Sequence, residues 1–598
     1  MRRALFLLAL ASLPFLVSRG EDPRVYVDYR EVMIPMRDGV GLQTVLLIPR
    51  NPSGPLPFLI DRTPYGVPSR ESVAPGFPAS QRWRSENYIA VFQNIRGRFQ
   101  SEGKFVMFRP PHDASATTDE TTDAWDTVDW LVKNIPNNNG RAGIAGTSYD
   151  GWTAVMAALE PHPALKAVVE QASPADQFLG DDFHHNGAFR LSYGFEYSAL
   201  LETTAEDNYH FEFDRADTFD WYLGLGVLSN AEEKYFHGKM PTWTDFTRHP
   251  NYDSFWQRQA FASYLNAVKL PILNVAGWWD QEDFYGPQKI YELLEPHDSR
   301  HYNYFVAGPW NHGGWLGDGS KLGELSFGSD TALHYREKIY QPWFDHWLRD
   351  PDQSWQLAEA TVFETGANQW REYASWPPKT GVEPRRLYLR EGRRLSFDTT
   401  GARGDDKFVS DPANPVPYRP RPISPTYPGP DWRVWLVQDQ RFAQNRPDVL
   451  TWQTEPLAGD LRIAGEIQAE LLASTSGTDS DWVVKLIDVY PKEGGELPGY
   501  QLLVASEILR ARYRDSFTNP QPVPAGKPVK YRIGLHTNAR SFLKGHRIMV
   551  QVQSSWFPLY DRNPQKFVAN IFEAHAADYV KATQKIYRGS AIVLPVVK

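Results

Sequence analysis

The stretch from Arg141 to Gly151, RAGIAGTSYDG, carries the strongest chemical signal in the sequence. Apolar residues run into Gly146, Ser148 follows, and the pattern then changes to that of a helix. A serine nucleophile needs such a sharp strand-to-helix turn, with small neighbours, to lift its hydroxyl above a sheet. The second glycine lies three residues after the serine instead of two, so the general G-x-S-x-G pattern is not met. A purely structural turn would explain the same residues.

Two further residues, Asp280 and His312, follow Ser148 in the chain order that a serine hydrolase on such a sheet requires. The serine needs a base, and the base needs a carboxylate to orient it. Asp280 follows the strand-like segment PILNVAGWW, and His312 follows YNYFVAGPWN. Both therefore lie just past the carboxyl ends of predicted strands, where the sites of such sheets are built. Any one of the 15 histidines could be a core or surface residue. The joint placement predicts the catalytic triad Ser148, Asp280 and His312.

Asp280 also begins a dense acidic run that continues through Glu282 and Asp283. Acidic residues are common in the first turn of a helix, and a helical pattern follows over Gly286–Leu294. From the residues alone, a solvated helix start is the favoured interpretation. The nearby pair His184 and His185 suggests metal binding, but no further ligands accompany it at useful spacing. We therefore predict no metal and no cofactor.

The elements around these residues alternate between strands and helices, which predicts parallel βαβ units. A turn signal at Asp38-Gly39 separates two strands within Val25–Arg50. The further predicted strands are Pro57–Ile60, Tyr88–Asn94, Gly143–Gly146, Ala164–Gln171, Pro271–Ala276 and Tyr302–Ala307. The predicted helices are Thr118–Lys133, Tyr149–Leu159 and one near His334–Leu348.

Two changes of pattern divide the chain. An aromatic-rich and charged insertion at 176–263 carries helical stretches without clear strands, which predicts a helical cap over the site. From 351 to 598, short alternating runs and many proline and glycine turns predict a β-sandwich or jelly roll. We therefore expect an α/β-hydrolase domain in two parts, 21–175 and 264–350, with a helical cap insertion and a C-terminal β jelly-roll domain.

The N-terminus has the features of an export signal. Arg2 and Arg3 precede an apolar run from Ala4 to Val17, and small residues follow at the two positions that a signal peptidase reads. This predicts a signal peptide over residues 1–20 and an exported protein, periplasmic or secreted, without membrane attachment after cleavage. A membrane anchor is the alternative, but the run is shorter than the roughly 20 residues that span a bilayer.

Composition excludes several classes of function. The net charge is −9 and no basic run occurs, so nothing favours a nucleic-acid partner. The absence of cysteine excludes disulfides, thiolate metal sites and cysteine nucleophiles. Aromatic residues make up 14% of the chain, with 21 Trp, which hints at apolar surfaces for a small-molecule substrate.

The motifs around the predicted triad resemble those of a known family. GTSYDG, GWWDQED and AGPWNHGG are similar to the serine, acid and histidine loops of the cocaine esterase and X-Pro dipeptidyl-peptidase group. In that group the downstream glycine also lies three residues after the serine. Within the group the chain most resembles the α-amino acid ester hydrolases, which are β-lactam antibiotic acylases. That likeness rests on WDQED (Trp279–Asp283), GDDFHHNGAFR (Gly180–Arg190) and the segment NIRGRF…SEGKFVMFRP (Asn94–Pro110).

The resemblance implies roles for five further residues. The backbone N–H of Tyr149 and the hydroxyl of Tyr65 correspond to the family's oxyanion hole, which stabilises the negative oxygen of the tetrahedral intermediate. Asp182, Glu282 and Asp283 correspond to carboxylates that bind the α-ammonium of the substrate. An ammonium has three donors and no acceptor, so several carboxylates can surround it. Asp181 adjoins Asp182, but the motif alignment favours Asp182.

We therefore expect a serine hydrolase or acyltransferase that cleaves esters or amides of α-amino acids through an acyl-enzyme. A general carboxylesterase or acylase of the cocaine esterase type, and an X-Pro dipeptidyl peptidase, are the alternatives within the group. A carbohydrate-binding protein with a decayed hydrolase domain is a further alternative, against which the intact triad argues. Homo-oligomerisation is an expectation from the family alone.

Overall fold

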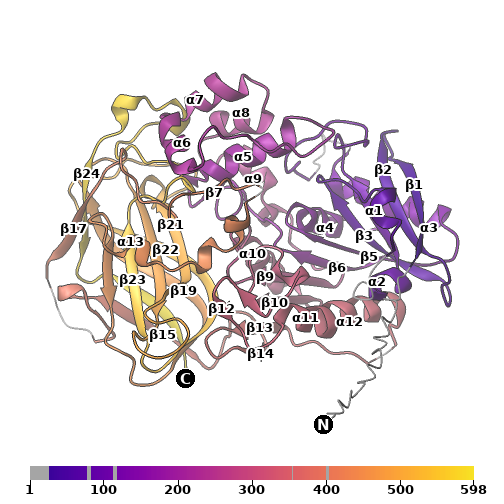
Figure 1. Cartoon of the computed structure of the whole chain (residues 1–598). Helices are drawn as coiled ribbons and strands as arrows, with labels where there is room; N and C mark the ends of the chain where they lie inside the picture. Colours follow the sequence, from indigo (N-terminus) through magenta and orange to yellow (C-terminus); the bar gives the residue numbers. More distant parts are fainter. Residues whose placement is uncertain (1–25, 77–81, 112–117, 353, 399–402, 428) are drawn as a thin grey trace, which may run out of the picture.

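The computed structural model describes residues 26–76, 82–111, 118–352, 354–398, 403–427 and 429–598, so the predicted signal peptide lies outside the described residues. Figure 1 shows a domain built on a mixed sheet, a group of helices at the top of the view, and an all-β domain formed by the C-terminal part of the chain. Within the described residues, no helix is both long and apolar enough to cross a membrane.

The first domain is built on a ten-stranded sheet. In spatial order, its strands are β1 (Val27–Pro35), β2 (Gly41–Pro49), β4 (Ile89–Asn94), β3 (Leu56–Thr63), β5 (Asn138–Thr147), β6 (Leu165–Gln171), β9 (Ile272–Gly277), β10 (Asn303–Gly308), β13 (Ala360–Glu364) and β14 (Gln369–Tyr373). The strands from β4 to β13 pair in parallel, whereas β1, β2 and β14 are joined by antiparallel pairing. Parallel pairing brings the carboxyl ends of the central strands to one edge.

Helices cover this sheet as the alternating pattern predicted. They include α3 (Glu120–Asn134), α4 (Tyr149–Leu159), α10 (Tyr285–Leu294), α11 (Thr331–Tyr335) and α12 (Gln341–Phe344). The short helices α1 (Arg70–Val73) and α2 (Arg82–Asn87) precede β4. The predicted helix near His334–Leu348 is a continuous helical segment, in which π-helical turns at 336–340 and 345–349 alternate with α11 and α12.

One boundary differs from the expectation. The sequence assigned all residues after 350 to the C-terminal domain, but β13 pairs with β10 in the first sheet, with Ala360 opposite Phe305. β14 then pairs with β13. A short alternating segment fits the edge of either sheet, because strand preference depends on the neighbours that the segment packs against.

The helical cap is inserted between β6 and β9. It contains α5 (Leu191–Glu202), α6 (Thr218–Leu225), α7 (Ser229–Ala231), α8 (Pro241–Arg248), α9 (Ser254–Gln259) and a ribbon of β7 (His184–His185) with β8 (Ala188–Phe189). Every residue of α5 from Leu191 to Leu201 is buried. It therefore lacks the amphipathic pattern by which a surface helix is recognised, and the sequence did not predict it. The cap aromatics form a core, in which Trp243 packs edge-on against Phe189 and Phe195.

The C-terminal domain is a sandwich of two antiparallel sheets. The larger sheet contains β16 (Leu395–Ser396), β15 (Val382–Leu389), β25 (Ala591–Val597), β19 (Leu461–Thr475), β24 (Ala582–Tyr587) and β17 (Asp405–Ser410), with β22 (Val529–Phe542) paired to β19. The other contains β18 (Leu450–Gln453), β23 (Arg547–Gln553), β20 (Asp481–Val489) and β21 (Gln501–Arg510). Apolar residues of both sheets, such as Leu471 and Val550, fill the space between them. This is the predicted jelly-roll domain.

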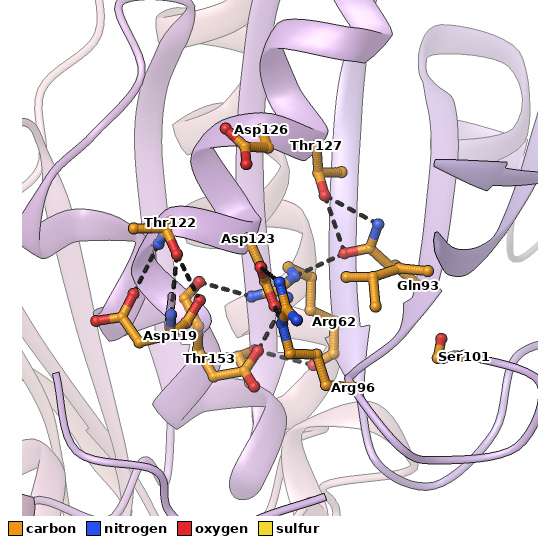
Figure 2. Close-up of polar contacts among 12 residues, drawn as sticks. Arg62, Gln93, Arg96, Ser101, Asp119, Thr122, Asp123, Asp126, Thr127 and Thr153 are labelled. Atoms are coloured by element: carbon orange, nitrogen blue, oxygen red, sulfur yellow. Dashed lines mark hydrogen bonds and ion pairs between the residues drawn. The ribbon is translucent and has the colours of Figure 1, made fainter. Parts of the chain in front are cut away.

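An ionic network that is buried except for Asp38 joins α3 to the first sheet (Figure 2). Arg62 Nη2 lies 2.9 Å from Glu120 Oε2, and both side chains are buried. Arg96 Nη2 donates to Asp123 Oδ1 at 2.7 Å, and Arg96 Nη1 lies 2.8 Å from Asp38 Oδ2. We call these five residues the α3 network. Each of its carboxylates has an arginine within ion-pair distance.

Candidate active site

Ser148 occupies the turn between β5 and α4, at the carboxyl edge of the sheet. Its backbone has φ 65° and ψ −128°, a positive-φ conformation that costs about 1–3 kcal/mol for a residue with a side chain. Hydrogen bonds hold this turn, because Ser148 N donates to Gln171 O and Trp152 N donates to Ser148 O, both at 2.9 Å. A strained turn that is fixed in this way is typical of a nucleophile elbow.

The two glycines around Ser148 explain the unusual spacing of the motif. A Cβ on Gly146 would lie 2.1 Å from Asp150 O, so this turn closes only with glycine. A Cβ on Gly151 would lie 3.0 Å from Gln171 O and 3.2 Å from Gly146 O. The glycine three residues after the serine is therefore favoured by the close approach of α4 to β5 and β6.

The loops after β9 and β10 bring Asp280 and His312 together. His312 Nδ1 lies 2.9 Å from Asp280 Oδ1 and 3.0 Å from Asp280 Oδ2. Asp280 Oδ1 also accepts the backbone N–H groups of Glu282 at 2.9 Å and Asp283 at 3.0 Å. The carboxylate is thus fixed by its own loop, and Nε2 of His312 is the nitrogen left to exchange a proton.

The other ring nitrogen of His312 faces a second carboxylate. Nε2 lies 3.8 Å from Glu282 Oε2, and within the described part of the chain no hydrogen bond joins it to Ser148. Burial lowers the pKa of His312, but the charges of Asp280 and Glu282 outweigh this effect and raise it to about 9. The imidazole of the free site is therefore mainly protonated at neutral pH.

Tyr65 lies on the loop after β3, and Tyr149 begins the helix that follows β5. The Tyr65 hydroxyl is 2.7 Å from the Tyr197 hydroxyl. Burial raises the pKa of Tyr65 well above its usual value, so the phenol keeps its proton and can donate it. Tyr149 is the first residue of α4, and the first N–H groups of a helix have no helical acceptor. Both groups are donors of the kind that an oxyanion hole needs.

Asp182 and Asp283 are buried carboxylates with unused acceptor atoms. Their exposed fractions are 2% and 0%. Within the described residues, Asp182 Oδ1 and both carboxylate oxygens of Asp283 have no hydrogen-bond partner. Burial raises the pKa of Asp182 to about 6. Burial and the neighbouring acids raise the pKa of Asp283 well above its usual value. Such buried acids are costly without a counter-charge, which indicates a binding site for a cation.

Asp181 differs from its neighbour Asp182. Its Oδ2 accepts the backbone N–H groups of Ala175 at 2.7 Å and Asp176 at 2.9 Å. These bonds join two parts of the loop after β6 to each other. They give Asp181 a structural function in this loop, although its Oδ1, like Asp182 Oδ1, has no hydrogen-bond partner among the described residues.

Glu282 is held by donors from the cap and from the segment between β17 and β18 of the C-terminal domain. Its Oε2 accepts the hydroxyls of Tyr193 and Tyr427, both at 3.2 Å, and its Oε1 accepts Trp432 Nε1 at 2.7 Å. No sequence motif predicted these three donors. Tyr427 and Trp432 lie 145 and 150 positions after Glu282, where no motif indicates that the chain returns to the site.

Arg190 is a buried cation beside the acidic residues, and its two terminal nitrogens donate to the backbone, whereas its Nε has no hydrogen-bond partner among the described residues. Its Nη1 donates to Glu282 O at 3.0 Å, and its Nη2 donates to Gln281 O at 2.7 Å. The guanidinium also lies over the Tyr193 ring, 4.4 Å from its centre. Arg190 therefore positions the backbone of the acid loop, and the sequence analysis did not foresee this function.

The two histidines considered as metal ligands have protein partners. His184 is buried and stacks on Phe178, with ring centres 4.5 Å apart. Burial lowers its pKa well below the usual value. His185 Nδ1 lies 3.0 Å from Glu507 Oε2 in the C-terminal domain. These contacts give both side chains a structural function.

Comparisons with known proteins cover both domains of the chain. The family model described as X-Pro dipeptidyl-peptidase (S15 family) matches residues 38–314. The model described as X-Pro dipeptidyl-peptidase C-terminal non-catalytic domain matches residues 346–591. The chain is also 30% identical to the cocaine esterase of Rhodococcus sp. (strain MB1 Bresler), over 95% of this chain and 98% of that protein.

Two solved structures are similar over nearly the whole chain. An aminopeptidase from the marine sediment archaeon Thaumarchaeota archaeon has a TM-score of 0.92 and 42% identity, and the match covers 99% of both chains. An α-amino acid ester hydrolase has a TM-score of 0.91 and 41% identity, over 98% of this chain and 100% of that one.

Proposed function

The chain belongs to the X-Pro dipeptidyl-peptidase (S15) and cocaine esterase group of serine hydrolases, and from this premise we propose that it transfers α-amino acyl groups. The substrate is an ester or amide of an α-amino acid, and the acyl group passes through an acyl-enzyme on Ser148. Water or an amine nucleophile then accepts it.

In the first step, His312 takes the hydroxyl proton of Ser148 on Nε2. Asp280 orients the ring through Nδ1, 2.9 Å away, and stabilises the imidazolium that forms. The Ser148 oxygen attacks the substrate carbonyl, and the carbonyl oxygen becomes an oxyanion. The imidazolium then gives its proton to the leaving alcohol or amine, and the carbon–oxygen or carbon–nitrogen bond breaks. Deacylation repeats these steps with the incoming nucleophile.

The Tyr65 hydroxyl and the Tyr149 N–H stabilise the oxyanion in this proposal. Each fixed donor of this kind is worth about 3 kcal/mol of transition-state stabilisation. The Tyr197 hydroxyl, 2.7 Å from that of Tyr65, can orient the donor.

The observation that carries the proposal is a set of three buried acids that form no ion pair with lysine or arginine among the described residues. Asp182 and Asp283 present unpartnered oxygens, and Glu282 has no ion pair with lysine or arginine among the described residues. An α-ammonium supplies both the missing charge and three donors. Such a desolvated contact is worth about 2–5 kcal/mol, which corresponds to roughly 30-fold or more in selectivity.

Cleavage of N-terminal residues from peptides is a second candidate, favoured by the 42% identity to the archaeal aminopeptidase. Both activities need a free α-amino group, so the acids support either. They differ in the leaving group, which is an alcohol for an ester and an amine for a peptide. A dipeptide cleaved within about tenfold of the kcat/KM of the methyl ester of the same residue would favour the aminopeptidase.

The test compares kcat/KM for phenylglycine methyl ester with that for its desamino analogue, methyl phenylacetate. The wild-type enzyme should prefer the amino ester by at least about 30-fold. Equal values would overturn the proposed selectivity and favour a general esterase.

Ser148→Ala is the matched test of the nucleophile. We expect a loss of at least about 10⁴-fold in kcat with the folded structure retained. Circular dichroism and the melting temperature provide the control for folding. Turnover by a folded Ser148→Ala variant at more than a small fraction of the wild-type rate would rule out the acyl-enzyme on Ser148.

A further inference from the structure

The two ring nitrogens of His312 both face carboxylates in the substrate-free site. Nδ1 lies 2.9 Å from Asp280 Oδ1, as a triad requires, but Nε2 lies 3.8 Å from Glu282 Oε2. A proton on Nε2 is therefore stabilised by the charge of Glu282. The proposed mechanism needs the opposite state, because Nε2 can take the Ser148 proton only when it carries none itself.

The charged groups around His312 come from two loops and are all acidic. Asp280 and Glu282 belong to the loop after β9, and Asp182 belongs to the loop after β6; the charge of each acts on the ring. Among the ion pairs of the described residues, Glu282 pairs only with His312. Arg190 donates to the backbone carbonyls of Gln281 and Glu282 in the loop after β9, not to a carboxylate.

The contacts of Glu282 keep its charge in place without cancelling it. Its hydrogen-bond donors Tyr193, Tyr427 and Trp432 are neutral groups. Their bonds hold the carboxylate in place, with Oε2 3.8 Å from Nε2 of His312. The carboxylate is thus positioned to act either on His312 or on a cation that enters the site.

We propose that Glu282 holds His312 in its protonated, inactive form while the site is empty, and that the α-ammonium of a substrate displaces this proton by taking over the charge of Glu282. This inference rests on the proposed function, because it assigns the ammonium to the same acids. The proton leaves Nε2 for solvent, and the neutral imidazole then accepts the Ser148 proton.

The consequence is that charge recognition also activates the base. Binding of an ammonium and protonation of His312 compete, and by linkage each weakens the other. An ester without an α-amino group meets an imidazolium and reacts slowly, even if it fits the site. The raised pKa of His312, about 9, agrees with this competition.

The direct test is a count of the protons released when an ammonium ligand binds. Phenylglycinol carries the ammonium and the phenyl group but no ester, and it is protonated at pH 7. Isothermal titration of the wild-type enzyme in buffers of different ionisation enthalpy should show release of about 0.5–1 proton per ligand. Binding without proton release would overturn the inference and leave the proposed function intact.

The same titrations also measure ligand affinity, which tests the ammonium site of the proposed function. Phenylglycinol should bind at least about tenfold more tightly than 2-phenylethanol, its desamino analogue. Equal or absent binding of the two would instead overturn the ammonium site itself, and the inference with it.

Two substitutions distinguish a specific effect of Glu282 on His312 from the effect of removing any acid of this loop. Glu282→Gln should weaken ligand binding and also abolish most of the proton release. Asp283→Asn is the matched control, because it removes another acid of this loop, whose pKa is raised, and keeps Glu282. It should weaken binding, and the proton release that remains in this variant belongs to His312. Equal proton counts in the two variants would contradict the assignment of this effect to Glu282.

A kinetic readout distinguishes this function from mere support of the site. In the wild-type enzyme, kcat/KM for methyl phenylacetate should rise with pH toward about 9, the pKa of free His312. Glu282→Gln should move this rise to lower pH by about one unit or more and increase the rate at pH 7 several-fold. A structural function of Glu282 predicts a loss of rate, so an unshifted profile or a slower variant would refute the proposal.

Discussion

Two groups of buried charges lie in the first domain, and they are built differently. In the α3 network, each carboxylate lies within ion-pair distance of an arginine. At the candidate active site, Asp182, Glu282 and Asp283 crowd together, and Arg190 beside them donates to backbone carbonyls instead. The first group consists of ion pairs within the protein. In the second group, no lysine or arginine forms an ion pair with these three acids among the described residues.

The contrast gives a way to distinguish structural charges from functional ones. A carboxylate that is buried and paired on folding contributes to a fixed structure, and its removal leaves a buried arginine without a partner. A carboxylate that is buried and unpaired lowers stability unless a ligand compensates. Apart from the exposed Asp38, the carboxylates of both groups are buried, so the partners are the informative feature.

The largest effect is expected in the α3 network. Arg62→Met should lower the free energy of unfolding by about 3–5 kcal/mol, because Glu120 remains buried without its partner. The substrate preference of the folded enzyme should not change. Denaturant unfolding and the amino-to-desamino ratio of kcat/KM measure the two properties. A changed ratio would show that the two groups of charges are not independent.

Arg37→Met provides the matched control for that substitution. Arg37 also pairs with an acid of α3, Asp126, but its side chain is 44% exposed. The substitution should lower the free energy of unfolding by less than about 1 kcal/mol, which is the range measured for surface ion pairs. If Arg37→Met lowered the free energy of unfolding as much as Arg62→Met, burial could not explain the large effect of Arg62→Met.

Asp283→Asn should act in the opposite direction on stability. The amide replaces a buried acid that has no hydrogen-bond partner among the described residues and whose charged form is disfavoured by burial and the neighbouring acids, so we expect the free energy of unfolding to rise by about 1–2 kcal/mol. Hydrolysis of phenylglycine methyl ester should weaken at the same time. Thermal unfolding measures the change in stability, and kcat/KM for phenylglycine methyl ester measures the change in activity. Lower stability together with full activity would mean that Asp283 is a structural acid.

The raised pKa of Asp182 should make the stability of the protein depend on pH. Its pKa is raised by burial from 3.8 to about 6, so the folded form holds a proton that the unfolded chain releases. The stability that this proton contributes is present below about pH 4 and is lost as the pH rises through 6. The difference in melting temperature between the wild type and Asp182→Asn, measured from pH 4 to pH 7, should follow this loss. A constant difference would contradict it.

The sequence alone predicted the sheet and the placement of Ser148, Asp280 and His312 at its edge. Parallel strands bring their carboxyl ends together, and the strands were recognisable from short apolar runs such as Gly143–Gly146. The geometry also explains Gly151, which looked misplaced against the general motif: α4 approaches β6 too closely at this position for most side chains.

The remaining parts of the site depend on contacts that no local pattern encodes. Tyr427 and Trp432 reach Glu282 from a segment far along the chain, and α5 is buried on all sides, so periodicity did not identify it. The residues alone favoured a solvated helix start for the acidic run. The buried, unpartnered state of Asp283 became apparent only from the packing around it.

The most direct test of the account is the ratio of kcat/KM for phenylglycine methyl ester to that for methyl phenylacetate, measured at pH 7 in the wild type and in Glu282→Gln. If the unpaired acids bind an α-ammonium, the wild-type ratio should be at least about 30 and should fall at least tenfold in the variant. A ratio that Glu282→Gln leaves unchanged would contradict the assignment of these acids to substrate recognition.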